Sequence, residues 1–390
     1  MPKSMWRPPR LRISGSDEER HATWMELFYD LLFAAVVAQL SLQLSQDISP
    51  RGLISFGALF VPVWWAWIGQ AFYATRFDTD DLGHRLFIIV QMCAVAAMAV
   101  NVHGGLSHSA AGFALSYALV RFLLVGEYIG ADVFVPAARP FIRRLEIGFG
   151  LAATLWLISA FVPPPFRFIL WGIGLLVDFA TPISAKRMHS QWAPHTSHLP
   201  ERFALFTLIV LGESITGVVS GLIRQEWRLA SALTAMLGLS LAFSLWWVYF
   251  DNLDNAAIRA ARAGRIWLYQ TWLYAHLPLV LGLTATAVGV QYGVFSPQDA
   301  VLSPGPRLLV CGGVALVLLS LGLIHLTSVL GRSRPGKNHV AFHFGTAALV
   351  LILGAVGHLR PVMLMGLLAL VCAFQVVLEI VSPQGPDQPA

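Results

Sequence analysis

The chain has 390 residues, of which 56% are hydrophobic and only 12% are charged, and its formal net charge is +5. Since soluble globular domains carry roughly 25% charged residues, this composition excludes an ordinary soluble enzyme and a disordered chain. Lys and Arg are spread along the chain in small groups instead of forming one basic patch, which argues against a nucleic-acid partner. The composition therefore indicates a membrane protein whose main partner is the lipid bilayer.

A membrane-spanning helix needs about 20 mainly apolar residues, and stretches of this kind follow one another along the chain. Short connections that carry Pro, Gly, Asp, Arg or His separate them, and none is long enough to hold a soluble domain. The sequence predicts an all-α, polytopic transmembrane helical bundle, with a basic tail at 1–21 and a short tail at 383–390. The twelve predicted spans are 22–45, 52–75, 85–104, 109–133, 144–162, 165–184, 202–222, 228–250, 265–291, 307–330, 339–357 and 361–382.

The positions of Lys and Arg predict how these helices cross the membrane. If the N-terminus is cytoplasmic, 19 of the 26 Lys and Arg residues fall in the N-terminal tail and the cytoplasmic connections. Six fall on the opposite side, and Arg121 falls within a span. Because Lys and Arg concentrate in the cytoplasmic loops of membrane proteins, we expect twelve spans with both termini in the cytoplasm.

Similar residues recur in the two halves of the chain, which predicts an internal repeat. Both halves, 22–184 and 202–382, begin on the predicted cytoplasmic side, so the repeats are expected to be two parallel six-helix bundles related by an axis along the membrane normal. Transporters built in this way bind substrate at the interface of the repeats. The matching positions are Glu19-Arg20 and Glu201-Arg202, Trp64-Trp65 and Trp246-Trp247, Arg85 and Arg265, and Arg139-Pro140 and Arg334-Pro335.

Seven ionisable residues within the spans are the candidate functional residues. An ionisable side chain near the middle of a bilayer costs about 2.5–3.5 kcal/mol by insertion scales and usually faces the interior of the bundle, where it often marks an ion or proton path. These residues are Glu26 and Asp30 in the first span, Arg121 and Glu127 in the fourth, Asp178 in the sixth, Glu213 in the seventh and His276 in the ninth.

Two interpretations of these residues stay open at the level of sequence. In the first, the acids of the first and seventh spans, above all Asp30 and Glu213, line a path for cations or protons. In the second, Arg121 locks helices together through a salt bridge with Glu213, Asp30 or Glu127. Arg121 is the only deep residue with a fixed positive charge, so at least one acid is expected to be its partner. His276 fits either a hydrogen-bonded core histidine or a proton relay.

Three segments carry a resemblance to a known family. They are residues 19–39 (ERHATWMELFYDLLFAAVVAQ), 201–215 (ERFALFTLIVLGESI) and 246–251 (WWVYFD). Together they resemble the bacterial low temperature requirement A (LtrA) family, and the number and spacing of the helices extend the resemblance over most of the chain. The resemblance implies a multi-pass protein of the bacterial inner (plasma) membrane that is connected with growth at low temperature. It implies no particular substrate.

A second resemblance concerns the first span alone. Residues 27–33 (LFYDLLF) are similar to the Phe-Ser-Asp motif in the first helix of a family of potassium channels that are built from parallel six-helix repeats. Tyr29 stands in place of the serine, and the seventh span has Leu-Gly-Glu-Ser at 211–214 instead of the motif. This resemblance implies a channel-like role in which Asp30 contributes to the path.

The sequence contains no dinucleotide-binding, phosphate-binding-loop, zinc-protease or nucleophile-elbow motif. We therefore expect no catalytic residues, no cofactor and no metal site. The leading hypothesis is a transporter or channel-like protein for a cation, a proton or a proton-coupled small solute. One alternative is a lipid-handling or enzymatic protein with an acidic and histidine site near the cytoplasm, including His325 and His343. Another is a structural or sensory membrane protein without transport. The sequence does not decide between a monomer and a homo-oligomer.

Overall fold

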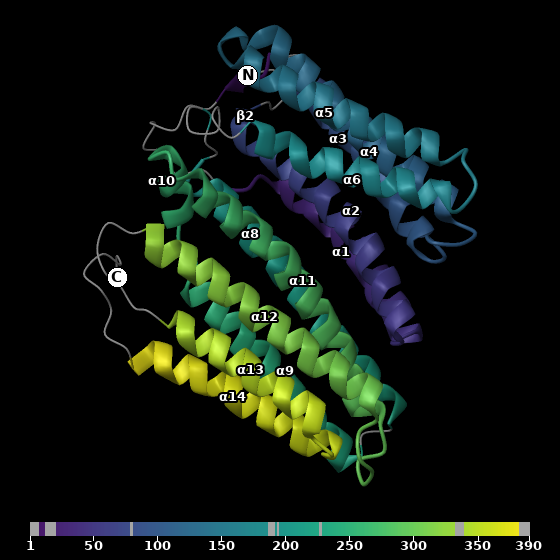
Figure 1. Cartoon of the computed structure of the whole chain (residues 1–390), viewed down its shortest axis with the longest axis vertical. Coiled ribbons are helices and arrows are strands. Elements are labelled where there is room, and N and C mark those ends of the chain that lie inside the picture. Colours follow the sequence, from purple (N-terminus) through teal and green to yellow (C-terminus); the bar gives the residue numbers. More distant parts are fainter. Residues whose placement is uncertain are drawn as a thin grey trace. The chain divides into compact units, whose positions relative to one another are not determined.

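The computed structural model describes residues 8–11, 21–78, 81–185, 192, 195–225, 228–331 and 339–381 of the chain. Long α-helices account for nearly all of these residues (Figure 1), and all the predicted apolar stretches are helical. Within the described residues the only strands are two residues long each, Arg10–Leu11 (β1) and Phe77–Asp78 (β2), and they pair antiparallel. The predicted all-α class is therefore confirmed, and the predicted tail 383–390 lies outside the described residues.

The helix boundaries lie within a few residues of the predicted ones. In chain order the helices are α1 (Trp24–Gln46), α2 (Pro50–Arg76), α3 (Leu82–Val102), α4 (Ala110–Phe134), the 3-10 turn η1 (Pro136–Ala138), α5 (Arg139–Ser159), α6 (Phe166–Ser184), α8 (His198–Arg224), α9 (Leu229–Asp251), the short α10 (Ala256–Arg262), α11 (Ile266–Phe295), α12 (Pro304–Gly331), α13 (Val340–Val356) and α14 (Pro361–Val381).

Ten of the described helices are long and apolar enough to cross a membrane, against twelve predicted spans. The two that differ are α5 and α13. Helix α5 begins at Arg139, before its predicted start, so that its first turns include Arg143, Arg144 and Glu146, and these charges lower its mean hydropathy. Helix α13 is apolar but has only 17 residues, which is shorter than the bilayer core requires. The chain is nevertheless a multi-span membrane protein.

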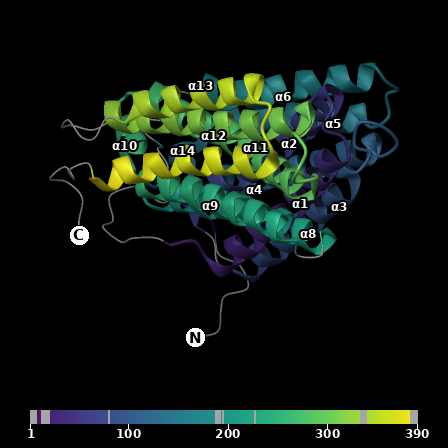
Figure 2. The same ribbon diagram turned by 90° about the horizontal axis from the view of Figure 1, so that it is seen from below.

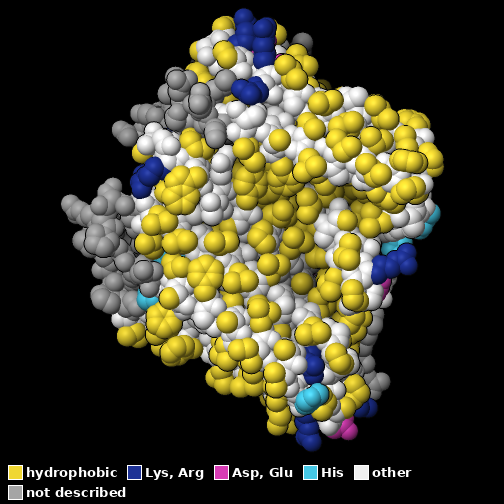
Figure 3. Space-filling model, viewed as in Figure 1, with side chains coloured by type: hydrophobic (Ala, Val, Ile, Leu, Met, Phe, Trp, Pro, Cys, Tyr) yellow, Lys and Arg dark blue, Asp and Glu magenta, His cyan; other side chains and the backbone are white. Residues whose placement is uncertain are grey.

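The outer surface of the helices is largely hydrophobic. Figure 3 shows hydrophobic side chains over most of the visible face, with few acidic side chains among them. Large apolar side chains such as Leu151, Leu176, Met236 and Leu370 are exposed along the helices. Apolar exposure on this scale would make a water-soluble protein aggregate, whereas lipid chains cover such a surface without cost.

The described helices form two compact units. The first unit comprises Met1–Leu40, Ser55–Arg202 and Ala261–Ile266, and the second comprises Ser41–Ile54, Phe203–Ala260 and Trp267–Ala390. The C-terminal end of α1 and the N-terminal end of α2 thus belong with the second unit. The division lies close to the predicted boundary between the halves 22–184 and 202–382, but the repeat itself stays a prediction.

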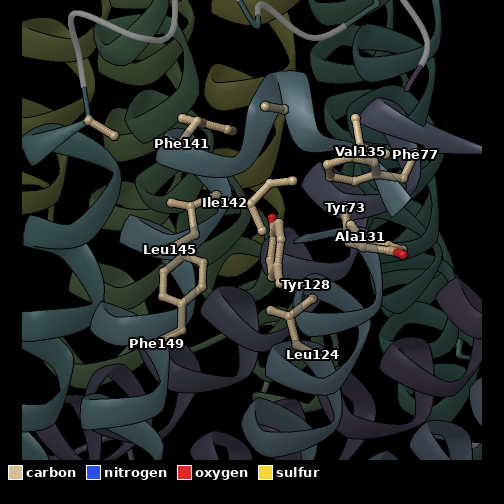
Figure 4. Packing of buried hydrophobic residues seen from close by; sticks show 12 residues of the cluster. Tyr73, Phe77, Leu124, Tyr128, Ala131, Val135, Phe141, Ile142, Leu145 and Phe149 are labelled. Carbon is tan, nitrogen blue, oxygen red and sulfur yellow. The ribbon is translucent and has the colours of Figure 1, made fainter. Parts of the chain in front are cut away.

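In the first unit, α4 packs against α3 and α5, and α5 packs against α6. A cluster of aromatic and aliphatic side chains from α2, α4 and α5 closes one end of this unit (Figure 4). Tyr128 lies at its centre, with its ring edge-on to that of Tyr73 at 5.3 Å between centroids. Phe149 extends the cluster toward the interior, where the charged side chains of the unit begin.

In the second unit, α9 packs against α14 and α12 against α13 (Figures 1 and 2). Helices α11 and α12 approach each other closely through small residues. A Cβ atom on Gly313 would lie 2.7 Å from the backbone nitrogen of Thr286, and one on Gly282 would lie 2.8 Å from the carbonyl oxygen of Gly313. Small residues at helix contacts allow this close packing inside a membrane.

Candidate functional site

Helix α2 provides polar contacts to several neighbouring helices inside the first unit. Because successive residues of an α-helix point about 100° apart, its polar side chains face different neighbours. The Trp67 indole donates to Asp30 of α1 at 2.8 Å, and the Gln70 amide donates to Glu127 of α4 at 3.3 Å. Gly69 leaves room for the guanidinium of Arg121 on α4, because a Cβ atom there would lie 2.7 Å from Nη1. The buried polar groups of the unit are therefore arranged around one helix.

Asp30 is held by a two-pronged salt bridge. Its side chain is 0% exposed, and Arg202 of α8 donates to it from Nε at 3.1 Å and from Nη2 at 2.6 Å. The fixed fork of an arginine matches a carboxylate in this geometry and gives strong, charge-assisted hydrogen bonds. With the Trp67 indole as a third donor, both carboxylate oxygens of Asp30 are satisfied.

Glu26 extends this salt bridge toward the N-terminal end of α1. It lies one turn before Asp30, and its carboxylate is 3.4 Å from Nη1 of Arg202 and 3.3 Å from Nε2 of His198. Nδ1 of His198 is in turn 3.2 Å from the Thr75 hydroxyl of α2. Glu26 and Asp30 are four residues apart and therefore lie on one face of α1, where both contact Arg202.

Arg202 is a site residue that could not be recognised from the predicted spans, because it stands at the very start of the predicted span 202–222 and counts there as a cytoplasmic cation. Helix α8 begins at His198, four residues before the predicted start, and so Arg202 is inside the helix and fully buried. Pro200 lies in the first turn of α8, where a proline fits a helix without losing a hydrogen bond. This proline is the signal in the sequence that indicates an earlier start of the helix.

The expected partners of Arg121 are wrong. Its salt bridge is with Asp178 of α6, and not with Glu213, Asp30 or Glu127. The Tyr117 hydroxyl donates to the other oxygen of Asp178 at 2.8 Å. The guanidinium lies over the Phe149 ring, 4.4 Å from its centroid, and its Nε and Nη1 donate no hydrogen bond to any described residue.

Glu127 differs from Asp30 and Asp178, the two buried acids that pair with an arginine. Its carboxylate accepts hydrogen bonds from two neutral amides, Gln70 at 3.3 Å and Gln91 of α3 at 2.9 Å. Among the described residues, no Lys or Arg lies within 4.0 Å of it, and the ionisable side chain within that distance is His84, whose Nδ1 is 3.7 Å from Oε1. Glu127 is thus a buried acid without a fixed positive charge beside it.

The remaining two candidates lie in the second unit. Glu213, on α8, is half-buried and forms neither a hydrogen bond nor an ion pair with any part of the chain that the structure describes. His276 is fully buried, with Nδ1 at 2.8 Å from the Trp272 carbonyl oxygen and Nε2 at 3.3 Å from the Tyr249 hydroxyl. Phe203 and Trp272 pack on its ring. These contacts fit the interpretation of His276 as a hydrogen-bonded core histidine.

The two histidines of the enzymatic alternative also lie in this unit and are buried. Nδ1 of His325 is 3.5 Å from Nε2 of His343, and Nδ1 of His343 is 3.1 Å from the side-chain oxygen of Gln375. Across the described ranges, no three His, Cys, Asp or Glu side chains come together in a way that could hold a metal ion. The pair therefore forms a buried hydrogen-bonded chain between α12, α13 and α14.

Comparison with known proteins places these observations in a family. The family model described as bacterial low temperature requirement A protein (LtrA) matches residues 21–377. A protein of Rhizobium meliloti (strain 1021), whose name describes it only as uncharacterized, is 29% identical over 317 residues, and the match covers 74% of this chain and 73% of the relative. No solved structure matches the chain.

Proposed function

The chain belongs to the bacterial low temperature requirement A family, and we propose that it transports a cation, a proton or a proton-coupled small solute across the inner membrane. The observation that carries this proposal is an excess of buried acid in the first unit. Within the described residues, four carboxyl groups of the helices, Glu26, Asp30, Glu127 and Asp178, have between them ion pairs with two guanidinium groups, Arg121 and Arg202. The third buried guanidinium of the unit, Arg76, donates to backbone carbonyl oxygens.

The excess is concentrated at one residue. Asp30 and Asp178 each have an arginine, and Glu26 shares Arg202 and contacts His198. Glu127 has two neutral amides. A buried carboxylate with no fixed positive charge beside it costs several kcal/mol in a medium of low polarity, so Glu127 is stable there when it holds a proton, pairs with protonated His84 or holds another cation. Acids of this kind are typical of the proton and ion paths of pumps and transporters.

The roles we assign follow from these partners. Glu127 exchanges the proton or cation, while the salt bridges Asp30–Arg202 and Asp178–Arg121 fix the helices around it. Asp30 remains part of the proposed path because it lies beside Glu26, which reaches the N-terminal end of α1. Glu213 is the proposed acid of the second unit. The proposed activity is transport and not catalysis.

The finer topology is also a proposal. Both termini are cytoplasmic, which the distribution of Lys and Arg supports, and the chain comprises two parallel six-helix repeats. In support of the repeat, the fourth and fifth long helices of each half pack against each other, α4 with α5 and α12 with α13. Reporter fusions to each terminus test the orientation. A reporter that is active only outside the cytoplasm should be inactive at both ends, and activity at either end would contradict the proposed orientation.

Flux measurements in proteoliposomes test the proposed function. The wild-type protein is screened with H+, Na+ and K+ gradients using ion-sensitive dyes trapped inside the vesicles. We expect Glu127→Gln to abolish flux, and Asp30→Asn and Glu213→Gln to reduce it strongly. The matched control is Glu146→Gln, the same substitution at a partly exposed position of α5, which should keep wild-type flux. Wild-type flux in Glu127→Gln, or no flux of any ion in the wild type, contradicts the proposal.

A further inference from the structure

We propose that His84 is the proton-uptake residue for Glu127: it takes a proton from water near the N-terminal end of α3 and passes it to the buried carboxylate. This inference rests on the proposed function and deepens it, because it names the proton as the exchanged cation and gives its route. The observation that carries it is the contact between one partly exposed and one buried ionisable side chain.

The two residues lie at different depths but touch. His84 is the third residue of α3. The carboxylate of Asp81, the residue before that helix, accepts a 2.7 Å hydrogen bond from the backbone nitrogen of His84. Glu127 lies seven residues before the end of α4 at Phe134, which at 1.5 Å per residue is about 10 Å inside the helix end. The side chains are 21% and 4% exposed, and Nδ1 lies 3.7 Å from Oε1.

The other groups that face Glu127 cannot supply protons from the surface. Gln70 of α2 and Gln91 of α3 are buried amides, which do not titrate. Tyr29 of α1 is within electrostatic reach of Glu127, but its ring is fully buried and its hydroxyl has no hydrogen-bond partner in the described part of the chain. Histidine is the side chain whose ordinary titration lies near neutral pH, so His84 is the group suited to link Glu127 to solvent.

The transfer balances in charge and atoms. A hydronium ion or a buffer acid on the His84 side protonates the neutral imidazole at the ring nitrogen that carries no proton. The resulting imidazolium gives its Nδ1 proton to Oε1 of Glu127, which leaves a neutral imidazole and a neutral carboxylic acid. Since 3.7 Å is longer than a direct hydrogen bond, a bridging water or a small side-chain rotation completes the path.

Infrared spectroscopy after a pH jump tests the route independently of transport. The protein is reconstituted in nanodiscs, and the carboxylic-acid band that is absent from Glu127→Gln reports protonation of Glu127. A positioned acid–base group accelerates proton transfer by about 10²–10⁴-fold, so we expect His84→Ala to slow the appearance of this band at least tenfold. Free imidazole in the buffer should restore the rate. The control His108→Ala removes an exposed histidine in the connection between α3 and α4 and should change nothing.

The outcomes separate this inference from the proposed function. If Glu127→Gln abolishes flux in proteoliposomes but His84→Ala leaves the infrared rate and the flux unchanged, transport stands and His84 is not the uptake residue. If Glu127→Gln keeps wild-type flux, the proposed function fails, while the infrared rate in His84→Ala still decides the role of His84. If the alanine variant folds poorly, His84→Asn is measured in its place. The inference is overturned if free imidazole raises the infrared rate of the variant by no more than it raises the rate of the wild type.

Discussion

Replacing Arg202 with Met should destabilise the protein by about 3–5 kcal/mol, which is the usual cost of removing one partner of a buried salt bridge. The structure supports this magnitude. The change removes two hydrogen bonds to Asp30, at 3.1 and 2.6 Å, and hydrogen bonds to charged groups contribute about 1.5–3 kcal/mol each. It leaves a fully buried carboxylate with the Trp67 indole as its donor. The methionine fills most of the vacated volume, so that the loss reports the charge and not a cavity.

The double variant Asp30→Asn with Arg202→Met separates the charge from the packing. Neutralising both partners removes the unpaired buried charge, and such double replacements are often close to neutral. We therefore expect the double variant to recover most of the lost stability, with an interaction free energy of at least about 2 kcal/mol from the double-mutant cycle. Stability is measured as the free energy of unfolding in mixed micelles, followed by circular dichroism.

The control for this series is Arg51→Met, which makes the same substitution at an exposed residue of α2. Surface changes of this kind are usually within about 0.5 kcal/mol. A loss below about 1 kcal/mol for Arg202→Met, or single-variant effects that simply add in the double variant, would refute the reasoning. Either result would mean that the contribution of Asp30 to the free energy of unfolding does not depend on Arg202.

Two glycine positions give further predictions. Gly313→Ala should cost about 1–3 kcal/mol, the usual range for overpacking, because its Cβ would lie 2.7 Å from the backbone nitrogen of Thr286; thermal unfolding measures this. Gly312→Ala, with open space around its Cβ, should be neutral or slightly stabilising, and an equal loss in both variants would contradict the close packing of α11 and α12. Gly69→Ala should displace Arg121 and lower the unfolding temperature, and an unchanged temperature would argue against the contact of Nη1 with this glycine.

The helices could be predicted well from the sequence, and the reason is physical. Inside a bilayer every backbone group must be bonded within its own segment, so a sufficiently long apolar stretch has one structural solution. The weak points were the ends, where hydropathy changes gradually. At α5 the charged residues Arg143 and Arg144 are part of the helix. Helix α8 begins at His198, so that Arg202, which counts as a loop cation in the sequence, is a buried partner of Asp30.

Pairing between helices could not be predicted in the same way. The choice of Asp178 as the partner of Arg121 depends on how α4 and α6 are rotated and how closely they pack, and neither is encoded in the spacing within one helix. The predicted partners were Glu213, Asp30 and Glu127. The long arginine side chain can reach an acid on any helix packed beside it, and the acid that it reaches is Asp178. By contrast, the shared face of Glu26 and Asp30 follows from helical geometry alone, because the two residues are four positions apart in one helix.

The arrangement around α2 sets how the proposed proton exchange at Glu127 acts on the rest of the first unit. Gln70 contacts Glu127, Trp67 contacts Asp30, and Gly69 lies against Arg121, so three neighbouring positions on one helix touch three charged groups from two other helices. When Glu127 takes up a proton, the charge that orients the Gln70 amide disappears. The neighbouring contacts, whose charges are fixed by salt bridges, remain. A charge change at Glu127 therefore acts on α2 through Gln70, while the contacts of Trp67 with Asp30 and of Gly69 with Arg121 keep their charges.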